Sequence, residues 1–110
     1  MKRIAFMFFV CTVACSLAVG GVSAKEASKE SHGEKLFMKH CSKCHPGGGN
    51  VVTVTKSLNP QDRAANNIKT EDDIIRLMRN PGPGMVKFGK KTISEKDAKA
   101  IAEYITKTFK

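Results

Sequence analysis

The sequence contains few of the large aromatic residues that usually fill a protein core. Its 110 residues include no tryptophan, one tyrosine and six phenylalanines, and three of the phenylalanines lie within the first nine residues. A chain of this length forms one small domain at most, and in a domain of about 80 residues a core made of side chains alone is marginal. We therefore expect something besides side chains to fill part of the core.

The sequence also lacks an apolar run long enough to span a bilayer. The longest run, Ile4–Val19, has 16 residues, whereas a transmembrane helix needs about 20. The basic pair Lys2-Arg3 precedes this run, and the small residues Val22-Ser23-Ala24 follow it. This is the pattern of a cleaved signal peptide.

We therefore predict a signal peptide over residues 1–24 and an exported domain over residues 25–110, without stable membrane insertion. The expected location is the periplasm or another exported compartment. A lipid anchor at Cys15 is the alternative, although Thr12 is a poor residue three places upstream.

Cysteine is scarce once this leader is removed, because Cys41 and Cys44 are then the two that remain. A structural zinc site needs four protein ligands, and no second C-x-x-C or H-x₃-H follows in the sequence. A thioredoxin-like dithiol stands at the start of a helix after a strand, whereas these cysteines end a helical segment. Both interpretations are therefore weaker than the one that includes the next residue.

Cys41-Ser42-Lys43-Cys44-His45 is C-x-x-C-H, the attachment signature for c-type haem. Two cysteines three residues apart on one helical face can each add a thiol to one vinyl group of the same porphyrin. The adjacent His45 can then bind the iron through one imidazole nitrogen. The motif predicts one covalently attached haem c, with His45 as an axial iron ligand.

A second axial ligand is expected from a methionine downstream of the motif. Met38 lies too close to Cys41 to reach the other face of the ring, and Met78 lies in an apolar helical stripe. Met85 stands in the loop sequence "PGPGMVKF", some 40 residues after His45. We therefore assign Met85 as the ligand, and the alternatives are His40, His32 and Lys87.

Three helical segments are predicted. The first runs from about His32 to Lys43, the second follows a Thr70 cap and stops before Pro81, and the third follows an N-cap at Ser94. The sequence between them, including "PGGGN" and "VVTVT", is expected to form loops rather than strands. Long loops in so short a chain are reasonable if they surround a large ligand.

The segments "GEKLFMKHCSKCH", "PGPGMVKF" and "SEKDAKAIAEYI" together resemble a class I monohaem cytochrome c. The run "CHPGGGNVVTVTKSL" is similar to the short bacterial and algal subgroup of the cytochrome c-six type. The resemblance covers residues 31–109. It implies an all-α fold of three or more helices, with long loops wrapped around one covalent haem.

The same resemblance assigns roles to particular residues. It implies that Gly33 and Phe37 pack against Tyr104 and that Met85 is the distal ligand. It also implies that the segment wrapping the haem edge is marked by Asn50, Lys56 and Leu58. The doubled Pro-Gly before Met85 departs from the family pattern, and the photosynthetic role of the family is not implied.

Axial ligation by His45 and Met85 would leave no open position on the iron. The predicted function is therefore outer-sphere transfer of one electron at a time, without enzymatic chemistry. The alternative is a small haem enzyme or ligand sensor, peroxidase-like, with a dissociable Met85. No distal His/Arg pair supports that alternative in the sequence.

The formal net charge of +9 falls to +7 once Lys2 and Arg3 leave with the leader. No recognition helix or basic patch interleaved with aromatics is present, so nucleic acid is not an expected partner. We expect a monomer that meets other redox proteins, acidic at the docking face. The lysines flanking the predicted haem segments are Lys35, Lys39, Lys43, Lys56, Lys87, Lys90 and Lys91. An ordinary solvated surface is the alternative explanation of these lysines.

Overall fold

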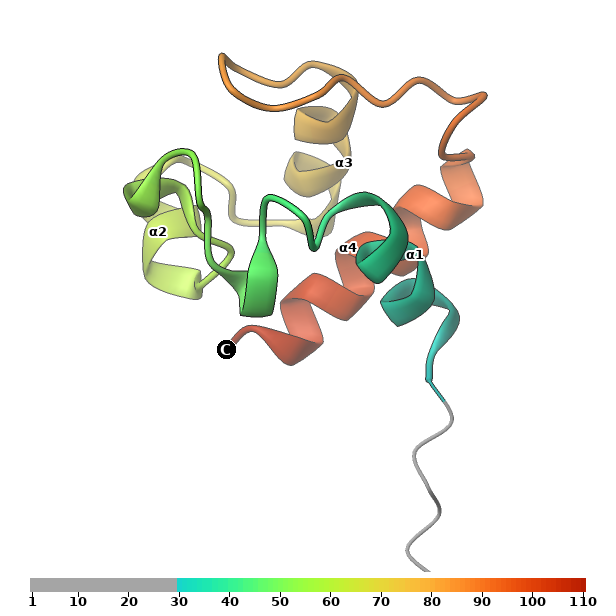
Figure 1. Cartoon of the computed structure of the whole chain (residues 1–110), viewed down its shortest axis with the longest axis horizontal. Coiled ribbons are helices and arrows are strands. Elements are labelled where there is room, and N and C mark those ends of the chain that lie inside the picture. The colour runs from blue at the N-terminus through green and yellow to red at the C-terminus, as the bar shows by residue number, and fades with distance from the viewer. Residues whose placement is uncertain (1–29) are drawn as a thin grey trace, which may run out of the picture.

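The computed structural model describes residues 30–110, so the predicted signal peptide and its cleavage site lie outside the described residues. Four α-helices and two short 3₁₀ turns follow in order: α1 (His32–His40), η1 (Pro46–Gly48), η2 (Val54–Lys56), α2 (Pro60–Ala65), α3 (Glu71–Arg79) and α4 (Glu95–Thr108). Figure 1 shows α1 crossing α4, with α3 above them and α2 to the left. No strand occurs in residues 30–110, and the predicted all-α class is confirmed.

The first helix is shorter than predicted, since it ends at His40 rather than near Lys43. After Cys41 the regular helical hydrogen bonds end, because the Ser42 N–H donates to the Phe37 carbonyl at 3.0 Å, which is five residues back instead of four. The N–H groups of Cys44 and His45 then both donate to the Cys41 carbonyl, at 3.1 and 2.9 Å. The attachment motif therefore lies on a tight turn after the helix.

Helix α2 was not among the three predicted helices. It has six residues and begins with an Asn59 cap, whose side chain accepts the Asp62 N–H, followed by Pro60 in the first turn. Its sequence "PQDRAA" has no apolar periodicity. The Asn-Pro pair was the available signal, because both residues favour a helix start.

Helices α3 and α4 begin at the predicted caps. Thr70 Oγ1 accepts the Asp73 N–H at 3.1 Å, and Asp73 Oδ2 accepts the Thr70 N–H at 2.9 Å. Ser94 Oγ accepts the Asp97 N–H at 3.1 Å. These bonds satisfy backbone donors that a helix start leaves free, so the caps fix where both helices begin.

The core lies between α1, α3 and α4. Phe37 of α1 is 2% exposed. The buried residues of α3 are Ile74, Ile75 and Met78, and those of α4 are Ala98, Ile101, Ala102 and Ile105. The Phe37 ring lies 5.3 Å from the rings of both Tyr104 and Phe109. The predicted packing of Phe37 on Tyr104 is confirmed, and Phe109 completes the aromatic cluster.

Gly33 allows α1 and α4 to approach closely, as the resemblance implied. A Cβ at this position would lie 2.2 Å from the Ala100 carbonyl oxygen of α4. That contact involves backbone on both sides, so it is relieved only by moving the helices apart.

Replacing Gly33 with alanine should therefore lower the free energy of unfolding of the haem-loaded protein by about 3 kcal/mol. Gly89→Ala is the matched control, because a Cβ there meets nothing within 4 Å. Its effect should stay within about 0.5 kcal/mol. Guanidinium titration of both variants measures this, and equal unfolding midpoints would contradict the close-approach argument.

Candidate haem site

A cavity with a volume of about 280 Å³ lies between α1, α3, α4 and the loops that connect the helices. Much of its wall is apolar, with contributions from Leu58, Ile68, Ile74, Leu77, Phe88 and Ile105. This is the space that the scarcity of aromatic residues led us to expect. Met78, predicted to be core, is 3% exposed and also borders the cavity.

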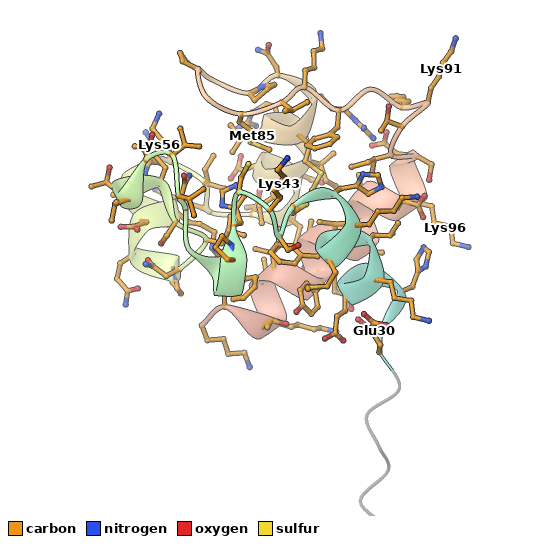
Figure 2. The ribbon with its side chains drawn as sticks, viewed as in Figure 1. Glu30, Lys43, Lys56, Met85, Lys91 and Lys96 are labelled. Carbon is orange, nitrogen blue, oxygen red and sulfur yellow. The ribbon has the colours of Figure 1, made fainter. Side chains whose placement is uncertain are left out.

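The structure brings all seven predicted site residues to this one cavity: Cys41, Cys44, His45, Asn50, Lys56, Leu58 and Met85. The three residues of the attachment motif come from the turn after α1, and Met85 comes from the loop between α3 and α4. In Figure 2 this loop crosses the top of the molecule, and Met85 lies on its lower side. The structure thus places the residues together, while their roles toward a cofactor stay predictions.

The His45 ring is held by a hydrogen bond that the sequence did not reveal. Its Nδ1 atom lies 2.7 Å from the Gly49 carbonyl oxygen. A neutral imidazole that donates from Nδ1–H keeps a lone pair on Nε2, which is the arrangement found in histidines that bind metal ions. The 3₁₀ turn Pro46–Gly48 places Gly49 for this bond, since the Gly49 N–H donates back to Pro46 at 3.0 Å.

The two cysteines of the motif form no disulfide, so both sulfur atoms are available for covalent bonds to haem. Burial raises the pKa of the Cys41 thiol to about 11, and the neighbouring Cys44 contributes in the same direction. Within residues 30–110 no three His, Cys, Asp or Glu side chains form a group that could hold a metal ion.

The alternatives to Met85 are engaged elsewhere or exposed. His32 Nε2 lies 2.8 Å from Asp97 Oδ1, and Lys87 is exposed. Met38, already set aside in the sequence, is 56% exposed. The His40 ring packs edge-on against Phe88 with centroids 6.0 Å apart, although His40 does border the cavity. Met85 combines a half-buried side chain with a position on the cavity wall.

Asn50 organises the loop that covers one edge of the cavity. Its Nδ2 donates to the Lys56 carbonyl at 2.9 Å, while its Oδ1 accepts the N–H groups of Val52 at 2.9 Å and Thr53 at 2.8 Å. The Leu58 N–H donates to the Gly48 carbonyl at 2.7 Å and closes the same loop. The segment that the resemblance marked is therefore tied together mainly by one asparagine.

Gly48 is required where this loop meets the aromatic cluster. Its φ of +83° is in the left-handed region, and a Cβ would lie 2.4 Å from the Phe109 ring. The glycine run after the motif thus serves close packing as well as turn formation.

One end of the cavity is polar, and sequence reasoning missed the residues that form it. They are Ser57, Asp62, Arg63 and Asn66. Ser57 Oγ donates to Asp62 Oδ2 at 2.6 Å, and Arg63 Nε donates to the Leu58 carbonyl at 2.9 Å. These residues belong to α2 and its flanks, so the failure to predict α2 hid them.

The residues fit a covalently attached porphyrin. Two thiols and an imidazole with a free Nε2 stand on one short turn, a thioether stands on a separate loop, and the enclosed wall is mainly apolar. An all-α fold with this donor set defines a small c-type haem protein.

Comparisons with known proteins place the chain more closely. The family model described as "Cytochrome C oxidase, cbb3-type, subunit III" matches residues 28–105. Cytochrome c6 from Cyanidium caldarium is 32% identical over 96 residues, which cover 87% of this chain and 85% of the relative.

Two solved structures are similar in fold as well as sequence. OmcF, an outer membrane cytochrome F from Geobacter sulfurreducens, has 46% identity and a TM-score of 0.69, covering 71% of this chain and 99% of its own. Cytochrome c6C from Synechococcus sp. PCC 7002 has 28% identity and a TM-score of 0.67, covering 72% and 95%.

The chain therefore belongs to the class I cytochrome c family, within its c6-type monohaem group. It binds one covalent haem c, and it is an electron-transfer protein rather than an enzyme. Among the helices of residues 30–110, none is both long and apolar enough to cross a membrane.

Changing Asn50 to alanine should loosen the loop at the cavity edge, because three hydrogen bonds are lost together. We expect the free energy of unfolding to fall by about 2 kcal/mol and amide exchange at Val52 and Thr53 to accelerate. Asn50→Asp keeps the acceptor oxygen and should lose less. Equal effects of the two variants would show that the acceptor bonds do not matter.

Proposed function

We propose that this cytochrome is an exported, monomeric one-electron carrier whose iron is held by His45 and Met85. The observation that carries the proposal is the common cavity, which brings the attachment motif and Met85 together although about 40 residues separate them. Met78 also lines the cavity, but it belongs to the buried core on α3, so Met85 would complete the ligand set.

When bound, haem c supplies an iron that gains and loses one electron. His45 would be oriented by its bond to Gly49, so that Nε2 is the ligating atom. Met85 would be the second protein ligand to the iron and would exclude substrate from it. A thioether ligand and an apolar wall both favour the reduced state, and so raise the reduction potential relative to two histidine ligands.

Export is supported by the signal-peptide pattern of residues 1–24. It is also consistent with the fold neighbour OmcF, whose title describes an outer membrane cytochrome. An exported compartment is oxidising, and two free cysteines so close together would tend to form a disulfide there. Covalent attachment to haem would keep Cys41 and Cys44 from doing so.

The redox partner would dock at the rim of the cavity. Val52 and Val86 line the cavity and are 57% and 67% exposed, and Val54 nearby is 81% exposed. A Cβ on Gly84 would lie 3.1 Å from Val52, so the two rim loops lie close together. Exposed apolar side chains at a functional opening indicate a contact surface.

Lysines at this rim would make it attractive to acidic partners. Of the seven lysines singled out in the sequence, Lys56 is the one that lines the cavity. In Figure 2 Lys91 and Lys96 point outward at the end of the molecule far from Lys56. Lys56 is therefore the lysine that we place at the docking face, and Lys91 lies away from it.

Replacing Met85 with alanine should abolish the weak near-infrared methionine–iron band of the oxidised protein and lower the reduction potential. Met38→Ala is the matched control, because that methionine is exposed on α1 and should leave both unchanged. Absorption spectra and a redox titration measure both quantities. Survival of the band in Met85→Ala would refute the ligand assignment.

Lys56→Glu should slow the oxidation of the reduced protein by the anion ferricyanide about tenfold at low salt. It should accelerate oxidation by a cationic cobalt complex. Lys99→Glu on α4 is the control, since it carries the same charge change away from the cavity. Stopped-flow rates at rising ionic strength should converge as screening increases. Equal rates for the two variants would place the docking face elsewhere.

A further inference from the structure

The loop that carries Met85 runs from residue 80 to residue 94 and has almost no hydrogen bonds of its own in its first half. From Pro81 to Lys87, no backbone hydrogen bond joins the loop to another residue of the described part of the chain. Loops of this length without regular structure are uncommon and generally need anchoring. The first anchor after Met85 is Phe88.

Both backbone groups of Phe88 are held by the end of α3. Its N–H donates to the Met78 carbonyl at 2.9 Å, and its carbonyl accepts from Arg79 Nη1 at 3.0 Å. Phe88 also packs its ring against His40. The segment between Arg79 and Phe88 is thereby closed on itself, with Met85 inside it.

Arg79 reaches the far end of the loop as well. Nη1 also donates to the Ile93 carbonyl at 2.8 Å, and Nη2 lies 3.4 Å from the Ser94 carbonyl and 3.5 Å from Glu95 Oε2. Its side chain is 19% exposed. Its Nε is buried without an acceptor in residues 30–110, so the two Nη groups make all of these contacts.

We propose that Arg79 is a positioning residue that fixes the Met85 loop against α3 and so governs how readily Met85 leaves the iron. The planar guanidinium holds five N–H donors in a rigid fork, whereas the three donors of a lysine ammonium sit on one atom at the end of a flexible stem. The effect of Arg79 on Met85 binding to the iron rests on the proposed function, whereas the contacts by which Arg79 fixes the loop do not.

The test compares Arg79→Gln and Arg79→Lys with Arg76→Gln and Arg76→Lys. Arg76 is on the same helix, has a 69% exposed side chain and bonds Asp73 at 2.6 Å. In the haem-loaded protein, Arg79→Gln should accelerate amide exchange at Phe88 about tenfold or more, relative to amides of α4. It should tighten imidazole binding to the oxidised protein by a similar factor, with Arg79→Lys intermediate and both Arg76 variants unchanged.

Each readout can overturn the inference. Unchanged Phe88 exchange in Arg79→Gln, or an equal rise in Arg76→Gln, would show that Arg79 does not hold the loop. Faster exchange without tighter imidazole binding, in a protein whose methionine–iron band is present, would show that the hold does not govern Met85. If the wild-type protein lacks that band, the assignment of Met85 as a ligand is wrong. Amide exchange at Phe88 then still tests whether Arg79 holds the loop.

If the Arg79 variants do not fold, nuclear magnetic resonance of the wild-type guanidinium decides the matter. Hydrogen-bonded Nη groups should show restricted rotation and slowly exchanging protons. Free rotation of the Arg79 guanidinium would overturn the proposal.

Discussion

The close crossing of α1 and α4 is the contact on which the other features of the structure depend. It requires Gly33, since a Cβ there would lie 2.2 Å from the Ala100 oxygen, and it brings Phe37 onto Tyr104. The attachment motif follows directly at the end of α1. The helix crossing therefore sets the position of the cysteines and His45, and it does so with backbone contacts that tolerate little adjustment.

The opposite wall of the cavity is built differently. Helix α3 contributes buried Ile74 and Met78 to the core, but Met85 is part of the loop that follows this helix. No helix fixes that methionine, so its position depends on contacts that the loop makes at Phe88 and at the start of α4. The histidine side of the site is thus rigid by packing, and the methionine side is held by a few polar bonds.

The sequence predicted those features that have a local signal. Caps at Thr70 and Ser94 were recognisable because a hydroxyl with an acidic residue three places later favours a helix start. The C-x-x-C-H motif and a methionine directly after two Pro-Gly pairs were equally local, and all seven proposed site residues line one cavity. The end of α1 was misplaced because the apolar spacing continues to Cys44 although the hydrogen-bond ladder stops earlier.

What escaped prediction were polar contacts to backbone carbonyls. Gly49 accepting from His45, and Phe88 and Ile93 accepting from Arg79, leave no periodic pattern in the sequence, because any residue has a carbonyl to offer. Helix α2 escaped for a related reason, since it is too short and too polar to show an apolar stripe.

The doubled Pro-Gly before Met85 gains a physical meaning from this architecture. Proline limits the freedom of the unfolded loop, so ordering it on folding costs less entropy. Gly84, at a φ of +91°, makes the sharp bend next to Met85 that other residues rarely adopt. In a segment without backbone hydrogen bonds to the rest of the described chain, this stiffness and the anchors at Phe88 act together. The methionine position is thereby maintained by restricting the chain on both sides of it, in addition to the packing of its half-buried side chain against the core.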